Sequence, residues 1–143
     1  NMDNNIICSG ALFYSTSTKR FMFLQRTSEK TKGMWGLVGG KMKYTESAFE
    51  GLKREIEEEV GSVSKFKKVI PLEMFTSNDQ KFYFHTYLIA IDNEFIPKLN
   101  EEHSGYCWCA FECWPKNLHL GLKNTLNNKG IKGKLQTILD LIT

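Results

Sequence analysis

The sequence lacks several features that define large classes of protein. No stretch approaches the roughly 20 apolar residues that a membrane-spanning helix needs, and the segment DNNIICSGALFY after Met2 has no basic leader. Internal repeats, low-complexity tracts and linkers are missing as well. These absences argue against a membrane protein and a repeat architecture, and we expect a cytoplasmic protein.

An excess of one charge is also missing. The formal net charge of +3 comes from 19 Lys and Arg against 16 Asp and Glu, too even a balance to indicate a nucleic-acid-binding protein by itself. Acidic residues concentrate between Glu46 and Glu59, whereas the last third of the chain is basic. Solvated lysines are the favoured interpretation of that basic region and an anionic partner is the alternative; the lysines concerned are Lys116, Lys123, Lys129, Lys132 and Lys134.

Cysteines are few, and their spacing does not indicate a zinc site. The segment CWCAFEC contains three of the four cysteines, but its C-x-C-x3-C spacing differs from the paired C-x2-C of structural zinc sites. Cys107 and Cys109 alternate with Trp108, as residues of a strand do. In a reducing cytosol we expect these thiols to be small core residues rather than metal ligands or disulfide partners.

The length of 143 residues, with 41% hydrophobic and 24% charged residues, fits one globular domain. Asn1 stands ahead of Met2, so we expect Asn1 to be a remnant of the expression vector and the domain to comprise residues 2–143.

Hydrophobic patterning predicts several strands and two helices, one in the middle of the chain and one at its C-terminal end. Runs rich in β-branched and aromatic residues, separated by polar turns, predict strands over 6–14, 20–26, 66–75, 81–91 and 105–111. Ile131, Leu135, Ile138 and Ile142 recur at helical spacing and predict an amphipathic C-terminal helix. We therefore expect an α+β fold, an α/β/α sandwich in which a mixed β-sheet lies between helices.

The strongest predicted helix covers residues 45–60. Thr45 or Ser47 can cap its start, Ser47 and Glu50 have the spacing of a capping box, and Gly61 suits the position just past its end. At 100° per residue one face is apolar, Glu57 lies roughly opposite, and three further glutamates share a flanking arc: Glu55, Glu58 and Glu59.

Three carboxylates on one arc of a helix repel one another unless a cation neutralises them. Oxygen ligands alone favour Mg²⁺ or Mn²⁺. A metal held there would bind phosphate oxygens, draw charge from phosphorus and lower the pKa of a bound water, as diphosphate hydrolysis requires. A remaining glutamate would then accept the proton of that water.

The segment GGKMKYTESAFEGLKREIEEEVG resembles the Nudix box, G-x5-E-x7-R-E-U-x-E-E-x-G-U, where U is aliphatic. Ser62 departs from the pattern at its last, aliphatic position, and Val38 stands where many members have proline. The positions that match are Gly40, Glu46, Arg54, Glu55, Ile56, Glu58, Glu59 and Gly61.

The resemblance implies a role for each matching side chain. Glu58 and Glu59, with the carbonyl of Gly39, would hold a divalent Mg²⁺ or Mn²⁺. Glu55 would be a further ligand or the general base, and Arg54 would orient Glu55 through a charge-assisted hydrogen bond. Gly40, Glu46 and Gly61 would support the box, with the Glu46 carboxylate acting at the loop–helix junction.

A second segment, NEEHSGYCW, resembles the E-H-x-x-Y-x-W sequence of many Nudix enzymes. Glu102 is the candidate for a fourth carboxylate there, as ligand or base, ahead of Glu101. His103 would contact phosphate or simply bond to backbone. We expect His119, in a different segment, to be structural.

Residues other than the carboxylates of the box are expected to bind the substrate. Arg26 and Lys41 would contact a polyphosphate. Stacking on a base is open to several aromatic residues, namely Trp35, Phe84, Tyr106 and Trp108.

The resemblance implies a Mg²⁺-dependent Nudix hydrolase in which a metal-activated water attacks a diphosphate linkage. The substrate would be a nucleoside diphosphate joined to another moiety, such as a sugar nucleotide, ADP-ribose, a dinucleoside polyphosphate or a nucleoside triphosphate. Two alternatives remain open, a non-catalytic nucleotide-sensing module and an RNA 5′-pyrophosphohydrolase. We expect a small-molecule substrate rather than nucleic acid, and no membrane partner. A homodimer remains possible.

Overall fold

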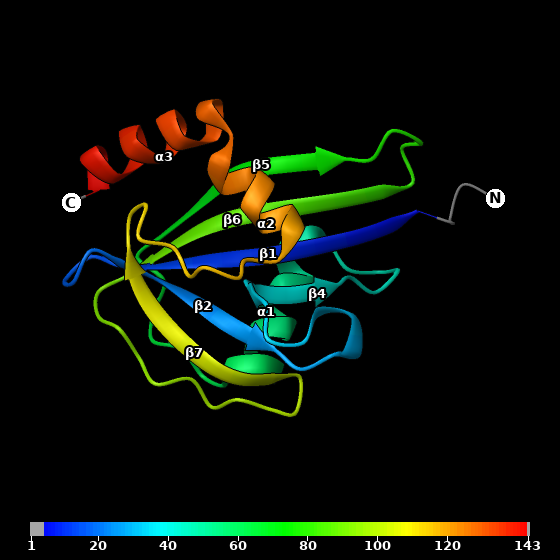
Figure 1. The fold of residues 1–143 in the computed structure, drawn as a ribbon, viewed down its shortest axis with the longest axis horizontal. Helices are drawn as coiled ribbons and strands as arrows, with labels where there is room; N and C mark the ends of the chain where they lie inside the picture. The colour runs from blue at the N-terminus through cyan, green and yellow to red at the C-terminus, as the bar shows by residue number, and fades with distance from the viewer. Residues whose placement is uncertain (1–4, 143) are drawn as a thin grey trace.

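The computed structural model describes residues 5–142. The strands are β1 (Ile6–Ser15), β2 (Arg20–Arg26), β3 (Trp35–Gly36), β4 (Val38–Lys41), β5 (Lys68–Thr76), β6 (Phe82–Ile91) and β7 (His103–Ala110). The helices are the short 3-10 turn η2 (Glu29–Thr31), α1 (Ala48–Val60), α2 (Leu120–Asn127) and α3 (Lys129–Ile142). Figure 1 shows that the strands lie between the helices, with α2 and α3 on one side and α1 on the other.

The sheet is mixed, as predicted, and β1 is its central strand. The strands follow the order β3-β2-β1-β6-β5, while β4 also pairs with β1 and β7 with β2. β1 runs parallel to β6 along its whole length. Along its other edge β1 pairs with β4 over residues 8–11 and then with β2 at Tyr14 and Ser15, antiparallel in both cases. One edge of β1 therefore pairs with two different strands, β4 along its first half and β2 at its end.

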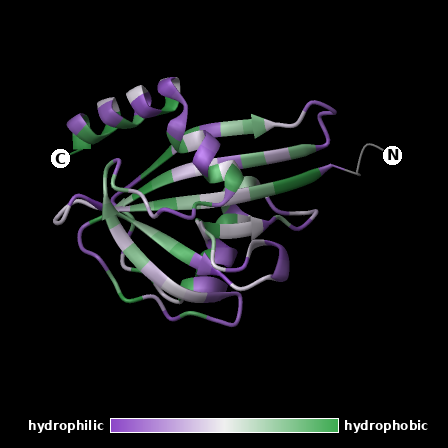
Figure 2. Cartoon of the chain, viewed as in Figure 1, coloured by the Kyte–Doolittle hydropathy of each residue, from purple (hydrophilic) through white to green (hydrophobic). Residues whose placement is uncertain are grey.

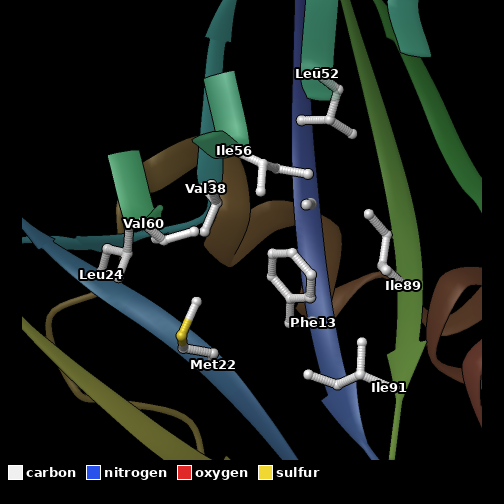
Figure 3. Close-up of a cluster of buried hydrophobic side chains, with 10 residues drawn as sticks. Phe13, Met22, Leu24, Val38, Leu52, Ile56, Val60, Ile89 and Ile91 are labelled. Carbon is white, nitrogen blue, oxygen red and sulfur yellow. The ribbon is translucent and has the colours of Figure 1, made fainter. Parts of the chain in front are cut away.

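Two apolar cores form because the side chains of each strand alternate between the faces of the sheet. On the α1 side, Leu52, Ile56 and Val60 pack against the strands, and Figure 3 shows them directed toward Phe13 of β1 and Ile89 of β6. Figure 2 shows hydrophobic residues concentrated along the strands and hydrophilic ones on the loops. The second core, on the α2 and α3 side, includes Leu12, Phe21, Phe23, Leu88, Leu122, Leu126 and Leu135.

Helix α1 begins and ends where the sequence indicates. Of the two candidate caps, Ser47 is the N-cap: its hydroxyl accepts from the backbone N–H of Glu50, and the Glu50 carboxylate accepts from the backbone N–H of Ser47. Gly61 follows the last turn with φ of 85°, a conformation that suits glycine. The predicted capping box is confirmed.

Helix α2 was not predicted. It has only eight residues, contains Gly121, and its N-cap His119 makes no side-chain capping bond, so local propensity is weak. Burial of Leu122 and Leu126 against the sheet stabilises it instead. Within residues 5–142, no helix combines the length and the apolar character needed to cross a membrane.

Candidate active site

The two glycines before α1 allow the backbone of β4 to approach the glutamates of the helix. The backbone N–H of Gly39 donates to Oε1 of Glu59 at 2.9 Å. A β-carbon on Gly39 would overlap the carbonyl oxygen of Ser9, and one on Gly40 would lie 2.8 Å from the Glu55 carboxylate. Glycine at position 39 is therefore a packing requirement, whereas a side chain at position 40 would displace the Glu55 carboxylate.

Glu59 is buried among other carboxylates. Only 2% of its surface is exposed. Burial, together with the negative charges of Glu55 and Glu102, raises the pKa of Glu59 to about 8, although the hydrogen bond from the Gly39 N–H acts in the opposite direction. The charges of three glutamates therefore converge on one buried position, although Glu102 lies 43 residues beyond Glu59 in the sequence.

Arg54 connects the carboxylates of the loop with those of the helix. Its guanidinium donates to both oxygens of Glu46, at 2.6 and 2.9 Å, to Glu55 at 3.0 Å and to Glu58 at 3.3 Å. These bonds to Arg54, and then the backbone N–H of Lys43, lower the pKa of Glu46 to about 2. Glu46 thus ties the loop to the helix, and Arg54 joins Glu46 to Glu55.

The donor set fits a hard divalent cation. Glu55, Glu58, Glu59 and Glu102 offer only carboxylate oxygens, which are ligands that such cations prefer. Within residues 5–142, no three acidic, histidine or cysteine side chains are yet arranged closely enough to hold a metal ion. Arg54 forms ion pairs with the carboxylates of Glu55 and Glu58. Burial of Glu59 beside two other negative charges nevertheless favours neutralisation by a cation at this point.

The loop before β7 places Glu102 at the site. The side-chain amide of Asn100 donates to the carbonyl of Glu58 at 3.0 Å, and its oxygen accepts from the N–H of Glu102 at 2.9 Å. Asn100 therefore joins the end of α1 to the loop, a role that no sequence pattern indicated. Glu101 points its backbone carbonyl to the hydroxyl of Thr27.

His103 is buried beside Arg26, with its imidazole Nδ1 left without a partner in the described part of the chain. Only 7% of its surface is exposed. Burial, and then the nearby charge of Arg26, lower its pKa to about 4. His103 is therefore a neutral side chain packed beside Arg26.

A pocket of about 600 Å³ adjoins the glycine turn and extends under α2. Of the expected substrate-binding residues, Arg26 and Phe84 line it, whereas Lys41 and Tyr106 do not. Arg26 lies against Gly36 and donates from Nε to the hydroxyl of Thr31 at 2.7 Å, which leaves its two terminal nitrogens directed at no protein acceptor among the described residues.

Further lining comes from residues that were not expected to bind the substrate. His119, which was expected to be structural, borders the pocket because it sits at the start of the unpredicted helix α2. Glu73 of β5 lines the pocket too. Trp35 and Trp108, two of the candidate stacking residues, lie outside this lining and pack against the two cores.

Comparison with known proteins identifies the family to which this chain is similar. The model of the NUDIX domain matches residues 7–128. Nudix hydrolase 7 from Arabidopsis thaliana is 32% identical over 69 residues, which cover 47% of this chain and 24% of that protein. The chain thus spans about a quarter of the length of this relative.

Solved structures show the same fold. A MutT NUDIX hydrolase from Burkholderia pseudomallei superimposes with a TM-score of 0.71 at 23% identity, covering 87% of this chain and 98% of that one. An Ap4A hydrolase from C. elegans has a TM-score of 0.69 at 18% identity, covering 93% and 98%.

A box of acidic residues on α1, set against a glycine turn in a sandwich of this topology, defines a Nudix hydrolase. The chain belongs to the Nudix family, because the family match spans most of its length. Enzymes of this family act on nucleotide-type substrates and generally use divalent metal ions.

Proposed function

We propose that this protein hydrolyses the diphosphate linkage of a nucleoside diphosphate joined to another moiety, using Mg²⁺ or Mn²⁺. The observation that carries the proposal is the position of Glu59. Its carboxylate is buried, bonded to the Gly39 N–H, close to the charges of Glu55 and Glu102, and beside the pocket that Gly39 borders.

In this proposal Glu58 and Glu59, with Glu55 and the carbonyl of Gly39, hold the cation. A divalent cation supplies positive charge to the phosphate oxygens and acidifies the attacking water. Arg54 keeps Glu55 in place, and Glu46 fixes Arg54 with two charge-assisted bonds. Arg26 presents its terminal nitrogens to a phosphate in the pocket.

Glu55 and Glu102 are the two candidates for the proton acceptor. Glu55 accepts a bond from Arg54 at 3.0 Å, whereas Glu102 has no ion-pair partner in the described part of the chain. A carboxylate that is not engaged in an ion pair keeps its oxygens available to accept the proton of the attacking water. We therefore assign Glu102 as the general base and Glu55 as a ligand.

This assignment predicts different defects in the two variants. Glu102→Gln should lower kcat at saturating metal and leave the metal concentration at half-maximal rate unchanged. Glu55→Gln should raise that metal concentration. Metal titrations of both variants measure the difference, and the reverse pattern would exchange the two roles.

The RNA 5′-pyrophosphohydrolase alternative receives less support. It was motivated by the basic last third of the chain, but Lys132 pairs with Glu112 at 2.8 Å and Lys134 donates to the carbonyls of Pro71 and Leu72. Those two charges are used within the protein. RNA binding that weakens steeply with salt would restore this alternative.

The first experiment is a phosphate-release screen with an added pyrophosphatase or phosphatase. The panel contains nucleoside triphosphates, sugar nucleotides, ADP-ribose, dinucleoside polyphosphates and 5′-triphosphorylated RNA, each with and without Mg²⁺. We expect metal-dependent turnover of one class. Glu59→Gln and Glu58→Gln should each lose more than about tenfold in kcat/KM, the loss typical even of outer-shell metal partners.

Matched controls separate loss of chemistry from loss of fold. Glu57→Gln removes an exposed glutamate of the same helix and should keep wild-type activity. Circular dichroism should show all three variants folded. Wild-type turnover in Glu59→Gln would contradict the roles, and silence across the panel with tight nucleotide binding would favour the sensing module.

A further inference from the structure

Strand β5 contains an irregularity that changes where Glu73 points. Pro71 pairs with Tyr87, but the next pair joins Glu73 to Thr86, so Leu72 is the extra residue of a β-bulge. In a regular strand Leu72 and Glu73 would point to opposite faces. The bulge instead allows Leu72 to be buried in the core under α2 and α3 while Glu73 lines the pocket on the same side.

Two helices hold this arrangement. Nζ of Lys134 on α3 donates to the carbonyls of Pro71 and Leu72, at 3.1 and 2.9 Å, and so satisfies backbone acceptors at the bulge. The hydroxyl of Thr125 on α2 donates to Oε1 of Glu73 at 2.7 Å. The carboxylate is therefore held in place while Oε2 and the second lone pair of Oε1 keep their capacity to accept.

Glu73 lies in one row with the glycine of the proposed metal site. Gly39 pairs with Gly10, Gly10 with Thr86, and Thr86 with Glu73, across β4, β1, β6 and β5. Three strand spacings separate the ends of this row by about 14 Å. All four residues line the same pocket. A nucleotide with its phosphates at Gly39 would thus extend its base toward Glu73.

The floor of the pocket between these ends is aromatic. The ring of Phe84 lies close to β1, since a β-carbon on Gly10 would approach it to 3.0 Å. Phe75, which pairs with Phe84 in the sheet, borders the same pocket and is half exposed. Rings of this kind provide a surface on which a base can stack.

The polar groups around the floor complement one kind of base edge. Glu73 accepts hydrogen bonds, whereas the side-chain amide of Asn124, one residue before Thr125, can donate and has no partner within residues 5–142. A carboxylate can accept two parallel N–H bonds. Guanine presents two adjacent N–H donors next to a carbonyl oxygen, and uracil does not.

We propose that Glu73 is a specificity-determining residue that selects guanine nucleotides by accepting from the two N–H donors of the base. The proposal rests on the proposed function for the position of the phosphates. It extends that function to a substrate class, the guanosine diphosphate derivatives, with Asn124 meeting the carbonyl oxygen of the base.

Calorimetric binding of nucleoside monophosphates tests this selection without turnover, because a monophosphate has no diphosphate linkage. GMP, IMP and UMP are titrated into the full chain with Mg²⁺ present. IMP lacks the exocyclic amino group of GMP and so removes one donor. The variants are Glu73→Gln, Thr125→Val, which releases the carboxylate, and the control Glu112→Gln, which removes an acidic residue outside the pocket.

We expect the wild-type protein to bind GMP about tenfold or more tightly than UMP, with IMP between them, since a bond to a charged group contributes this much. Glu73→Gln should weaken GMP binding by about tenfold and leave UMP unchanged. Thr125→Val should reduce the preference in the same direction, and Glu112→Gln should keep it. Thermal unfolding verifies that each variant is folded.

Equal affinity of the wild-type protein for GMP and UMP would overturn the proposal, as would parallel losses for both ligands in Glu73→Gln. Different results would reject the proposed hydrolase function and the role of Glu73. Guanine-selective binding with no turnover in the phosphate-release screen rejects the hydrolase alone, whereas metal-dependent turnover that ignores the base rejects only the role of Glu73.

Discussion

At the scale of single residues, the absence of a side chain is as important as the charged groups. Gly39 lies against β1, and its N–H reaches the buried carboxylate of Glu59. Any β-carbon there would overlap backbone atoms of Ser9 and Gly10, which a flexible side chain cannot relieve. The position of the acidic site relative to the sheet therefore depends on this glycine.

Gly39→Ala should destabilise the protein by roughly 2 kcal/mol or more, because overpacking against backbone forces β4 away from β1. Denaturant unfolding measures the change. The shift should also lower kcat, since the bond to Glu59 is displaced. A fully stable and active variant would contradict the close packing of this turn.

Gly133→Ala is the matched control. Gly133 lies inside α3, and a β-carbon there would meet nothing within 4 Å. Alanine is the better helix former by up to about 1 kcal/mol, so this variant should be as stable as the wild-type protein or more so, with unchanged activity.

At the scale of elements, α1 combines two tasks. One face packs into the core through Leu52 and Ile56, and the neighbouring arc carries the acidic site. The Ser47 capping box stabilises the start of the helix. Burial of Leu52 and Ile56 in the core sets the rotation at which Glu55 and Glu59 face the glycine turn.

Ser47→Ala should lower the free energy of unfolding by about 1 kcal/mol, the usual contribution of an N-cap hydroxyl. Chemical denaturation measures the loss, and Ser64→Ala, at an exposed position of the loop after α1, should leave the stability unchanged. Equal stability of the two variants would show that the capping box contributes nothing.

At the scale of the whole molecule, the site joins parts that are distant in sequence. The carboxylates come from α1 and from the loop before β7, and the adjoining pocket lies between the sheet and α2. A cation that binds this assembled site stabilises the entire fold, because the unfolded chain does not present the ligands together.

Mg²⁺ should therefore raise the melting temperature. At a concentration 100 times its Kd, the added stability is about 2.7 kcal/mol, which corresponds to a shift of roughly 5 °C or more in a domain of this size. Differential scanning calorimetry measures the shift with and without Mg²⁺. Glu59→Gln should shift much less, and an equal shift in both proteins would place the cation elsewhere.

The sequence by itself determined what depends on neighbours along the chain. Local sequence was enough to indicate the capping box of Ser47 and Glu50, because residues three apart lie within one helical turn. The resemblance to the Nudix box likewise rested on residues that are close together in the sequence. Alternating side chains were enough to indicate the strands and the sandwich, since the period of a strand determines which face is buried.

Only the tertiary structure decided what depends on packing between distant segments. Helix α2 forms because Leu122 and Leu126 are buried against the sheet, and its presence placed His119 beside the pocket. The bulge at Leu72 places Glu73 on the same side of the sheet as Leu72, whereas a regular strand would place the two side chains on opposite faces. Local sequence carries no signal for contacts of this kind.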